Sequence, residues 1–356
     1  MTSRSRILTL AVAALACAAP ASAAPTLIRT EAPPGEIAVG AGGMWVVQES
    51  VPRALRLYDL ATGRAVGQPV PLDDAGRVPQ YFGKPFVPCC AVPHPLLVAA
   101  GSAWTVTMGG RIVRATRRGE TIEITTIGVQ GAARDVTAGT SGVHALEVQV
   151  PGGVPWAGHR VDTVDPATNA VTPGGLFDPP VTGGTIFEGA GPIQLAAGDP
   201  GVFWGTKASV AMYALRLDRL PASRSAGTAG VPVVRGARLL ARARGVSWFK
   251  SQYGCAITRV SPAGRMTALP QRWDAPSRGG CRLRRMTADG RGRLWAIGQI
   301  RGLARGWVFR FDGTTGRLAG PPHRVGTDPW SLAPVGGGVW VGDFTARTIR
   351  FVPARG

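Results

Sequence analysis

Short apolar segments alternate with glycine-rich turns along most of the chain, and the same pattern returns seven times. In each unit an apolar run, such as residues 37–39 or 331–334, leads through a turn to one marked position. That position carries an aromatic residue in six units and a histidine in one: Trp45, Trp104, His144, Phe203, Trp248, Trp295 and Trp340. A repeat of roughly 45 residues is typical of a propeller or a solenoid.

The first unit shows which elements the pattern predicts. Residues 37–39 and 44–47 are short apolar strands, and residues 54–58 alternate as a half-buried strand does. A turn at Asp59–Gly63 then leads to a fourth strand over residues 64–70. Later units repeat this order, and none contains a convincing amphipathic helix. We therefore expect four-stranded antiparallel blades.

The last unit is one strand short. It offers strands at 330–333, 339–341 and 348–352, and we expect residues 26–30 to supply the missing outer strand. Such a clasp closes the ring and removes an open edge. The predicted fold is thus an all-β β-propeller with seven four-stranded antiparallel blades, closed by an N-terminal strand in the last blade. The irregular stretch 217–234 leaves six or eight blades open.

The N-terminal residues have the features of a secretory signal peptide. Arg4 and Arg6 precede an apolar stretch, residues 7–18, that is too short to span a bilayer. Small residues at Ala21-Ser22-Ala23 then offer a cleavage site. We expect residues 1–23 to be a signal peptide.

The rest of the chain, residues 24–356, is expected to be a single propeller domain that is secreted, periplasmic or extracellular. The alternative is a lipoprotein anchored through Cys17. No later segment has the roughly 20 unbroken apolar residues of a membrane helix, and a monomer is expected.

Four cysteines remain after the leader: Cys89, Cys90, Cys255 and Cys281. An even number in an oxidising compartment indicates disulfides. Cys255 and Cys281 fall on loops of neighbouring units, so we expect them to pair. Cys89 and Cys90 are candidates for a strained vicinal bridge, and their connectivity stays open.

The chain carries a net charge of +19, which suits anionic partners such as a cell-surface polymer. Composition offers a simpler explanation, because lysine is rare whereas arginine, alanine, glycine and proline, all with GC-rich codons, are abundant. Aromatic residues do not alternate with basic ones as in a single-strand binding groove, so nucleic acid is not an expected partner.

One face of the predicted ring gathers the long loops. In a propeller, the loops between the second and third strands and the links between blades share one face, here called the channel-mouth face. Three of these loops are long: residues 73–93, 150–159 and 176–192. Binding usually resides on such loops, although tolerated insertion is an equal alternative. The expected ligand-binding residues are Tyr81, Phe82, Trp156, Phe187 and Glu188.

Catalytic motifs are missing: the sequence has no H-E-x-x-H, G-x-S-x-G or G-K-[ST] pattern. His94 and His323 each precede a predicted first strand, while Glu49 and Asp343 fall on loops of the channel-mouth face. These four are weak catalytic candidates for an acid–base pair or a divalent cation. No other cofactor and no defined metal site is predicted. His144 is expected to be a buried, hydrogen-bonded stand-in for an aromatic residue.

Two stretches carry a family resemblance: Ile37-Ala38-Val39-Gly40-x-Gly-x-x-Trp45-Val46 and Asp312-x-x-Thr315-Gly316-Arg317. They resemble the extracellular propellers of the YVTN-repeat and streptogramin-lyase-like superfamily. The resemblance implies the fold over the whole mature chain more than a function. Streptogramin lyases of that group work with histidines, a glutamate and magnesium near the channel, but no motif here matches those residues, so none is transferred.

Two functional hypotheses follow. The first is an exported propeller that binds an extracellular ligand, glycan or protein on the long-loop face. The alternative is a lyase or hydrolase with a metal-assisted site at the channel mouth. The sequence favours the first, without excluding an enzyme.

Overall fold

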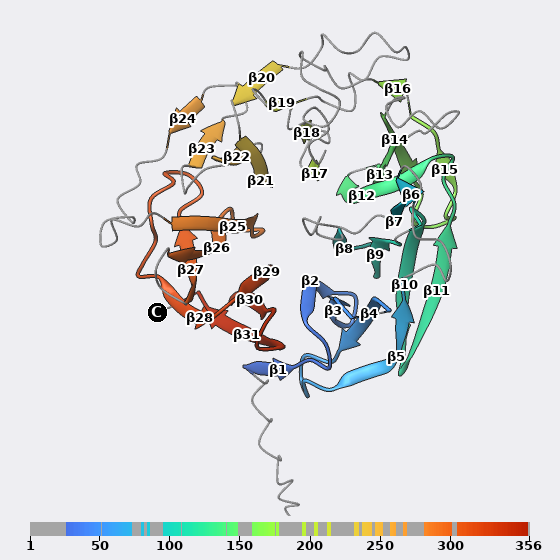
Figure 1. Ribbon diagram of the computed structural model, residues 1–356, viewed down its shortest axis with the longest axis horizontal. Helices are drawn as coiled ribbons and strands as arrows, with labels where there is room; N and C mark the ends of the chain where they lie inside the picture. Colours follow the sequence, from blue (N-terminus) through green and yellow to red (C-terminus); the bar gives the residue numbers. More distant parts are fainter. Residues whose placement is uncertain are drawn as a thin grey trace, which may run out of the picture.

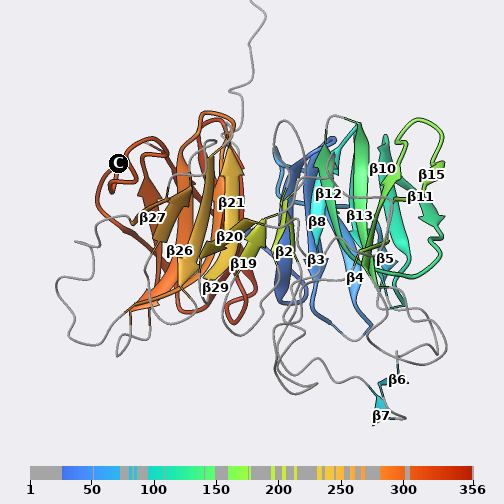
Figure 2. The same ribbon diagram turned by 90° about the horizontal axis from the view of Figure 1, so that it is seen from above.

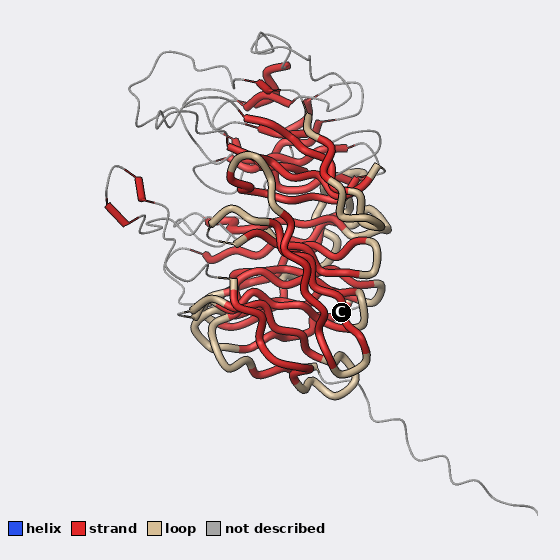
Figure 3. The backbone as a smooth tube through the Cα atoms, turned by 90° about the vertical axis from the view of Figure 1, so that its right-hand side faces the viewer, coloured by secondary structure: helices blue, strands red, loops and turns tan. Residues whose placement is uncertain are grey.

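The computed structural model is an all-β ring of sheets (Figure 1). It describes residues 26–50, 52–72, 80–81, 84–85, 95–107, 109–139, 141–148, 159–174, 176–177, 194–196, 203–205, 212–214, 231–234, 237–243, 246–251, 257–260, 266–268, 281–300 and 305–354. Within these ranges the regular elements are strands, joined by loops and turns (Figure 3).

Three antiparallel sheets form the first half of the ring, each in chain order from the inner strand outward. The first contains β2 (Pro34–Gly40), β3 (Gly43–Gln48), β4 (Ala54–Tyr58) and β5 (Ala65–Pro71). The second contains β8 (Leu96–Ala99), β9 (Ser102–Val106), β10 (Ile112–Arg118) and β11 (Thr121–Ile127). The third contains β12 (Ala132–Gly139), β13 (Gly142–Val148), β14 (His159–Val164) and β15 (Val171–Thr172), with β16 (Leu176–Phe177) also paired to β14.

Three more sheets complete the other half. One contains β21 (Ala237–Ala243), β22 (Val246–Ser251), β23 (Ile257–Val260) and β24 (Met266–Ala268). The next contains β25 (Cys281–Ala288), β26 (Leu294–Ile300), β27 (Gly306–Phe311) and β28 (His323–Gly326). The last contains β29 (Pro329–Val335), β30 (Gly338–Asp343), β31 (Thr348–Pro353) and β1 (Leu27–Arg29).

Two short strand pairs lie between the β12 sheet and the β21 sheet. They are β17 (Gln194–Ala196) with β18 (Phe203–Gly205), and β19 (Met212–Ala214) with β20 (Val231–Val234). β17 contacts both β12 and β21, so the pairs lie where the fourth predicted blade belongs. A four-stranded sheet is not described there, and the count of seven stays a prediction.

The predicted clasp is confirmed. β1 pairs antiparallel with β31, with Ile28 opposite Ile349. The Ile28 side chain is 1% exposed and packs in a cluster that includes Met44 of the first sheet and Trp340 of the last. The N-terminal strand therefore contributes both a ladder edge and core packing to the last sheet.

The core lies between neighbouring sheets, and the marked aromatic positions supply its largest side chains. Trp45 packs with Ala103 and Val113 of the second sheet, and Trp295 packs with Leu332 and Val341 of the last. Trp104, Trp248 and Trp340 occupy the same kind of position in the other described clusters. Burying such large apolar side chains is a main source of stability in a β-fold.

The predicted turn between the third and fourth strands is present and is held by the side chain of Asp59. Asp59 Oδ1 accepts hydrogen bonds from the amides of Ala61 and Thr62 at 2.9 and 3.0 Å. The amide of Thr62, which favours the carboxylate, lowers the pKa of Asp59. Gly63 has φ 69°, and Asn169, which takes its place in the third sheet, has φ 62°. Asparagine tolerates this left-handed conformation better than most residues do, which explains the exchange.

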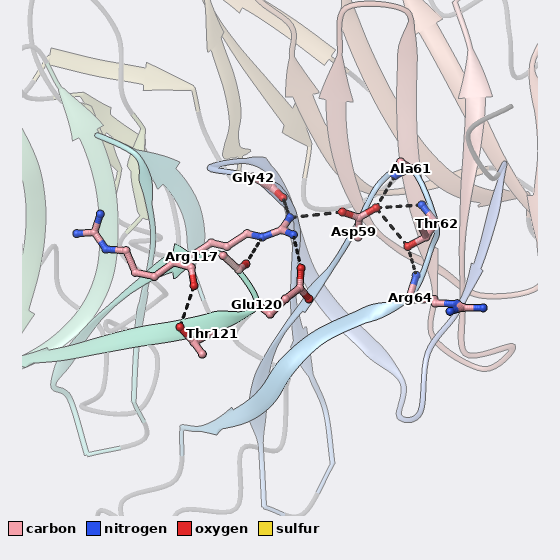
Figure 4. A network of polar contacts seen from close by, with 10 residues as sticks. Gly42, Asp59, Ala61, Thr62, Arg64, Arg117, Glu120 and Thr121 are labelled. Atoms are coloured by element: carbon pink, nitrogen blue, oxygen red, sulfur yellow. Dashed lines mark hydrogen bonds and ion pairs between the residues drawn. The ribbon is translucent and has the colours of Figure 1, made fainter. Parts of the chain in front are cut away.

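An arginine joins this turn to the next sheet (Figure 4). Arg117 of β10 donates a hydrogen bond to the carbonyl oxygen of Gly42, and its Nη1 lies 3.5 Å from Asp59 Oδ2. Its Nη2 lies 3.5 Å from Glu120 Oε1. These contacts lie at the ends of the first two sheets opposite the channel-mouth face, where they help to hold neighbouring sheets together.

Replacing Arg117 by alanine should lower the free energy of unfolding by about 1 kcal/mol, because a charge-assisted hydrogen bond and an inter-sheet contact are lost. Urea denaturation measures the change. The control is Arg118→Ala, whose side chain is 68% exposed and pairs with Glu123 within the same sheet. Equal losses for the two variants would contradict an inter-sheet role for Arg117.

The predicted long loops begin and end slightly differently in the structure. His159 starts β14 and residues 176–177 form β16, so these positions belong to the third sheet rather than to loops. Within 73–93, β6 (Gln80–Tyr81) and β7 (Lys84–Pro85) form a two-stranded pair. That pair lies apart from the ring, beyond one of its faces (Figure 2).

Candidate functional site at the channel mouth

The inner strands are irregular where they begin, at the channel-mouth face. Register shifts occur between Pro34 and Ile37 in β2, and between Leu283 and Arg285 in β25. A third lies between Pro329 and Ser331 in β29. A β-bulge inserts an extra residue and redirects neighbouring side chains, and bulges are frequent near functional sites.

The bulged regions of β2 and β25 are joined by an ion pair. Arg285 of β25 pairs with Glu36 of β2, although β29 lies between these strands and contacts both. The Arg285 guanidinium lies 6.0 Å from the ring centroid of Trp330 on β29. The side chains of Arg285 and Glu36 are 22% and 13% exposed, respectively. Arg285 therefore connects three inner strands at the channel-mouth face.

A second arginine, Arg284, also lies near the Trp330 ring. Arg284 lies 5.4 Å from the Trp330 centroid and forms an ion pair with Asp328, in the link that precedes β29. Phe344, just after β30, lies 5.6 Å from Trp330, ring centroid to ring centroid. A cation near an aromatic face is attracted by the quadrupole of the ring.

The carboxylates of this region differ in their surroundings. Burial raises the pKa of Glu36, and the nearby Glu49 adds to the rise, while the Arg285 charge opposes it. Glu49 itself pairs with Arg53 at 2.7 Å. We define the channel-mouth cluster as these eight residues: Glu36, Glu49, Arg53, Arg284, Arg285, Asp328, Trp330 and Phe344. It offers both charge signs and an aromatic surface.

Asp343 anchors the loop structure beside this cluster. It is 2% exposed, and its Oδ2 accepts hydrogen bonds from the amides of Thr327 and Asp328 at 2.8 and 3.2 Å. Its Oδ1 accepts a bond from the amide of Ala346 at 2.8 Å. These bonds hold the segment that carries Asp328.

Within the described ranges, the structure does not bring the other catalytic candidates together into one site. His323 lies in β28, the outermost strand of its sheet, and pairs with Val308, so its expected place before a first strand is wrong. His94 lies outside the described residues. Glu49 belongs to the cluster, as given above. Among the side chains that the structure describes, no group of three or more His, Cys, Asp or Glu is placed to hold a metal ion.

Most of the predicted ligand-binding and disulfide residues cannot be compared with the structure. Tyr81 and Cys281 begin or end strands, but their side chains lie outside the description. The remaining predicted positions fall outside the described ranges altogether: Phe82, Trp156, Phe187, Glu188, Cys89, Cys90 and Cys255. Their roles stay predictions.

The repeat contained a signal for part of the cluster. Ala38 pairs with Trp45 and Thr287 pairs with Trp295, so both mark the same place in the blade. Glu36 and Arg285 stand two residues before these positions. Glu36 lies nine residues before Trp45 and Arg285 lies ten before Trp295, so an alignment that allows one extra residue in the turn before Trp295 would have shown charged residues at equivalent positions. The bulges that add Arg284 and Trp330 have no such sequence signature.

His144 has the predicted structural role. It is 5% exposed, with Nδ1 3.0 Å from Thr163 Oγ1 and Nε2 3.3 Å from Ser141 Oγ. Burial lowers its pKa, because the charged imidazolium is disfavoured away from water. The hydroxyl groups around it replace the apolar contacts that an aromatic residue would make.

Antiparallel sheets arranged around a ring and closed by β1 define a β-propeller. No protein-family model matches the sequence, and no curated protein matches it. The structure is similar to virginiamycin B lyase from Staphylococcus aureus, with 14% identity, a TM-score of 0.56, and coverage of 91% of this chain and 96% of that one. It is also similar to Kuenenia stuttgartiensis hydrazine synthase, with 11% identity, a TM-score of 0.59, and coverage of 92% and 97%.

A further streptogramin B lyase structure gives 15% identity and a TM-score of 0.57, covering 91% of this chain and 95% of that one. At such identities the likeness concerns the fold. The predicted resemblance to streptogramin-lyase-like propellers is confirmed at that level. The described part of the chain holds no helix with the length and apolar character needed to cross a membrane.

Proposed function

We propose that this protein is an exported β-propeller that binds a ligand, glycan or protein on its channel-mouth face. The observation that carries the proposal is the channel-mouth cluster. The inner strands β25 and β29 bring Arg284, Arg285 and Trp330 together with Glu36 of the inner strand β2 and with Asp328 of the link before β29. The predicted binding loops belong to the same face by topology.

The composition of the cluster supports recognition of a polar ligand. Arginine forms bidentate hydrogen bonds to carboxylate and phosphate groups, and tryptophan stacks on planar or sugar-like surfaces. The arginines and Trp330 are partly exposed, and each arginine has a carboxylate partner. This pairing preorganises the guanidinium groups, so less entropy is lost when a ligand is bound.

The long loops are expected to supply the aromatic anchors of the same site. Substituting Trp156 and Phe187 together by alanine should weaken binding of the glycan or peptide that the protein recognises at least tenfold, since aromatic anchors dominate binding energy. Arrays of defined glycans and peptides identify the probe, and calorimetry measures its affinity. The control is Ile124→Ala, an exposed apolar residue on β11, the outer strand of the second sheet.

Unchanged binding in the double variant, with binding lost in Trp330→Ala, would place the ligand over the cluster without the loops. Unchanged binding in both variants would contradict the proposal. Metal analysis of the purified protein distinguishes the enzymatic alternative from a propeller that only binds its ligand. A stoichiometric divalent cation whose removal abolishes turnover of an array substrate would favour a lyase or hydrolase.

A further inference from the structure

A buried group of three charged side chains lies at the channel-mouth end of the third sheet. Glu147 of β13 and Arg160 of β14 are directly opposite in the ladder, and Asp162 follows two residues later on β14. Their exposures are 0%, 5% and 0% respectively. Arg160 Nη2 donates to Glu147 Oε2 at 2.9 Å and to Asp162 Oδ2 at 3.1 Å.

The charges of this group do not balance. Two carboxylates share one guanidinium, and an uncompensated charge in a buried site is costly. Because the same Arg160 nitrogen lies within hydrogen-bond distance of an oxygen of each carboxyl group, Glu147 and Asp162 are close neighbours. A proton on one of the two carboxyl groups removes the uncompensated negative charge, and the protonated group can then donate a hydrogen bond to the other. The geometry therefore points to a bound proton.

The surroundings support the same conclusion. Burial, followed by the hydrogen bond to Asp162, raises the pKa of Glu147 to about 7, while the Gly131 amide and the Arg160 charge oppose the rise. On β12, the strand on the other side of β13, Asp135 Oδ1 accepts a hydrogen bond from the amide of Val136. Among the described side chains, Arg160 also contacts the uncharged Gln130: its Nη1 donates to Gln130 Oε1 at 2.9 Å.

We propose that Glu147, Asp162 and Arg160 form a proton-sensitive tie that fastens the third sheet at the channel-mouth face. Glu147 Oε2 accepts a hydrogen bond from the amide of Gly131 at 2.8 Å. Asp162 Oδ1 accepts one from the amide of Gly174 at 3.1 Å. The tie thus joins β13 and β14 to the link that precedes β12 and to the segment that follows β15.

The switch follows from electrostatics. With one proton bound, the carboxyl pair and Arg160 are neutral together and the two carboxyl groups share a hydrogen bond. When Glu147 releases this proton to water, two buried negative charges face each other beside one guanidinium, and their repulsion loosens the tie. Hydration of the two charged carboxylates then competes with the backbone pairing of β13 and β14, because water can reach the carboxylates only if these strands separate. This inference does not depend on the proposed ligand.

Infrared difference spectroscopy between pH 5.5 and 8.5 tests for the proton directly. A buried protonated carboxyl group should give a carbonyl band that is present at the lower pH and lost near neutral pH. Glu147→Gln should remove this band, because the amide imitates the protonated side chain without titrating. The control is Glu123→Gln, whose side chain is 58% exposed and pairs with Arg118 on the surface.

Hydrogen exchange supplies the second readout. After correction for the intrinsic pH dependence, exchange at Gly131 and Gly174 should accelerate at least tenfold between pH 5.5 and 8.5 in the wild-type chain. It should stay constant in Glu147→Gln. A carboxyl band that persists in that variant, or exchange at the two glycines that is independent of pH in the wild type, would overturn the proposal.

Discussion

Replacing Ile28 by alanine should lower the free energy of unfolding by about 2–5 kcal/mol. This side chain is 1% exposed and is the buried residue of the three-residue clasp β1. It packs with Met44 of the first sheet and Trp340 of the last, so truncation leaves a cavity where the two ends of the ring meet. Urea denaturation followed by tryptophan fluorescence measures the loss.

The matched control lies next to Ile28 in the same strand. Leu27 is 39% exposed and pairs with Arg350, so Leu27→Ala should change stability by no more than about 0.5 kcal/mol. Similar small effects for both variants would mean that β1 contributes little to closure. A loss confined to Ile28→Ala supports closure by packing as well as by backbone hydrogen bonds.

Stability should also decrease as pH rises from about 4.5 to about 7, through the single carboxyl group of Glu147. Its pKa is 4.5 in an unstructured chain and about 7 in the folded protein. Below pH 4.5 the group is protonated in both states, so its contribution is fully present. Between these values the unfolded chain releases the proton while the folded protein retains it, which favours unfolding. The contribution lost is about 3 kcal/mol.

Glu147→Gln should remove this dependence. Because other titrating groups affect both proteins alike, the difference between the two unfolding free energies isolates Glu147. Urea denaturation at pH 4.5, 6 and 8 should show the variant gaining on the wild type as pH rises. Parallel curves over this range would contradict a raised pKa for Glu147, whatever the absolute stabilities.

The repeat pattern predicted much of the fold because local chemistry and burial agree in each unit. Apolar alternation located β2 to β5, and the predicted turn at Asp59–Gly63 is present, with hydrogen bonds from backbone amides to Asp59. The tryptophan positions that the repeat marks supply packing between sheets, for example Trp45 and Trp295. The histidine in the same position, His144, is buried and hydrogen-bonded as expected.

The candidate site was much less predictable. Glu49 was chosen from its loop and does belong to the channel-mouth cluster, whereas His323 was expected just before a first strand and instead lies in β28, the outermost strand of its sheet. Arg284 and Trp330 were not considered, because their positions result from bulges that a strict two-residue period does not reveal. The long loops that dominated the sequence argument lie mainly outside the described residues.

By itself, the sequence determined the strand rhythm, the aromatic packing positions and the closure by an N-terminal strand, because each depends on local periodicity or on one missing partner. Only the tertiary structure decided which charged side chains meet. Arg285 reaches Glu36 across an intervening strand, and Glu147 shares Arg160 with Asp162 inside one sheet. Both contacts depend on strand register and on the order of strands around the ring. Their electrostatic consequences depend on burial, which a linear pattern of charges does not specify.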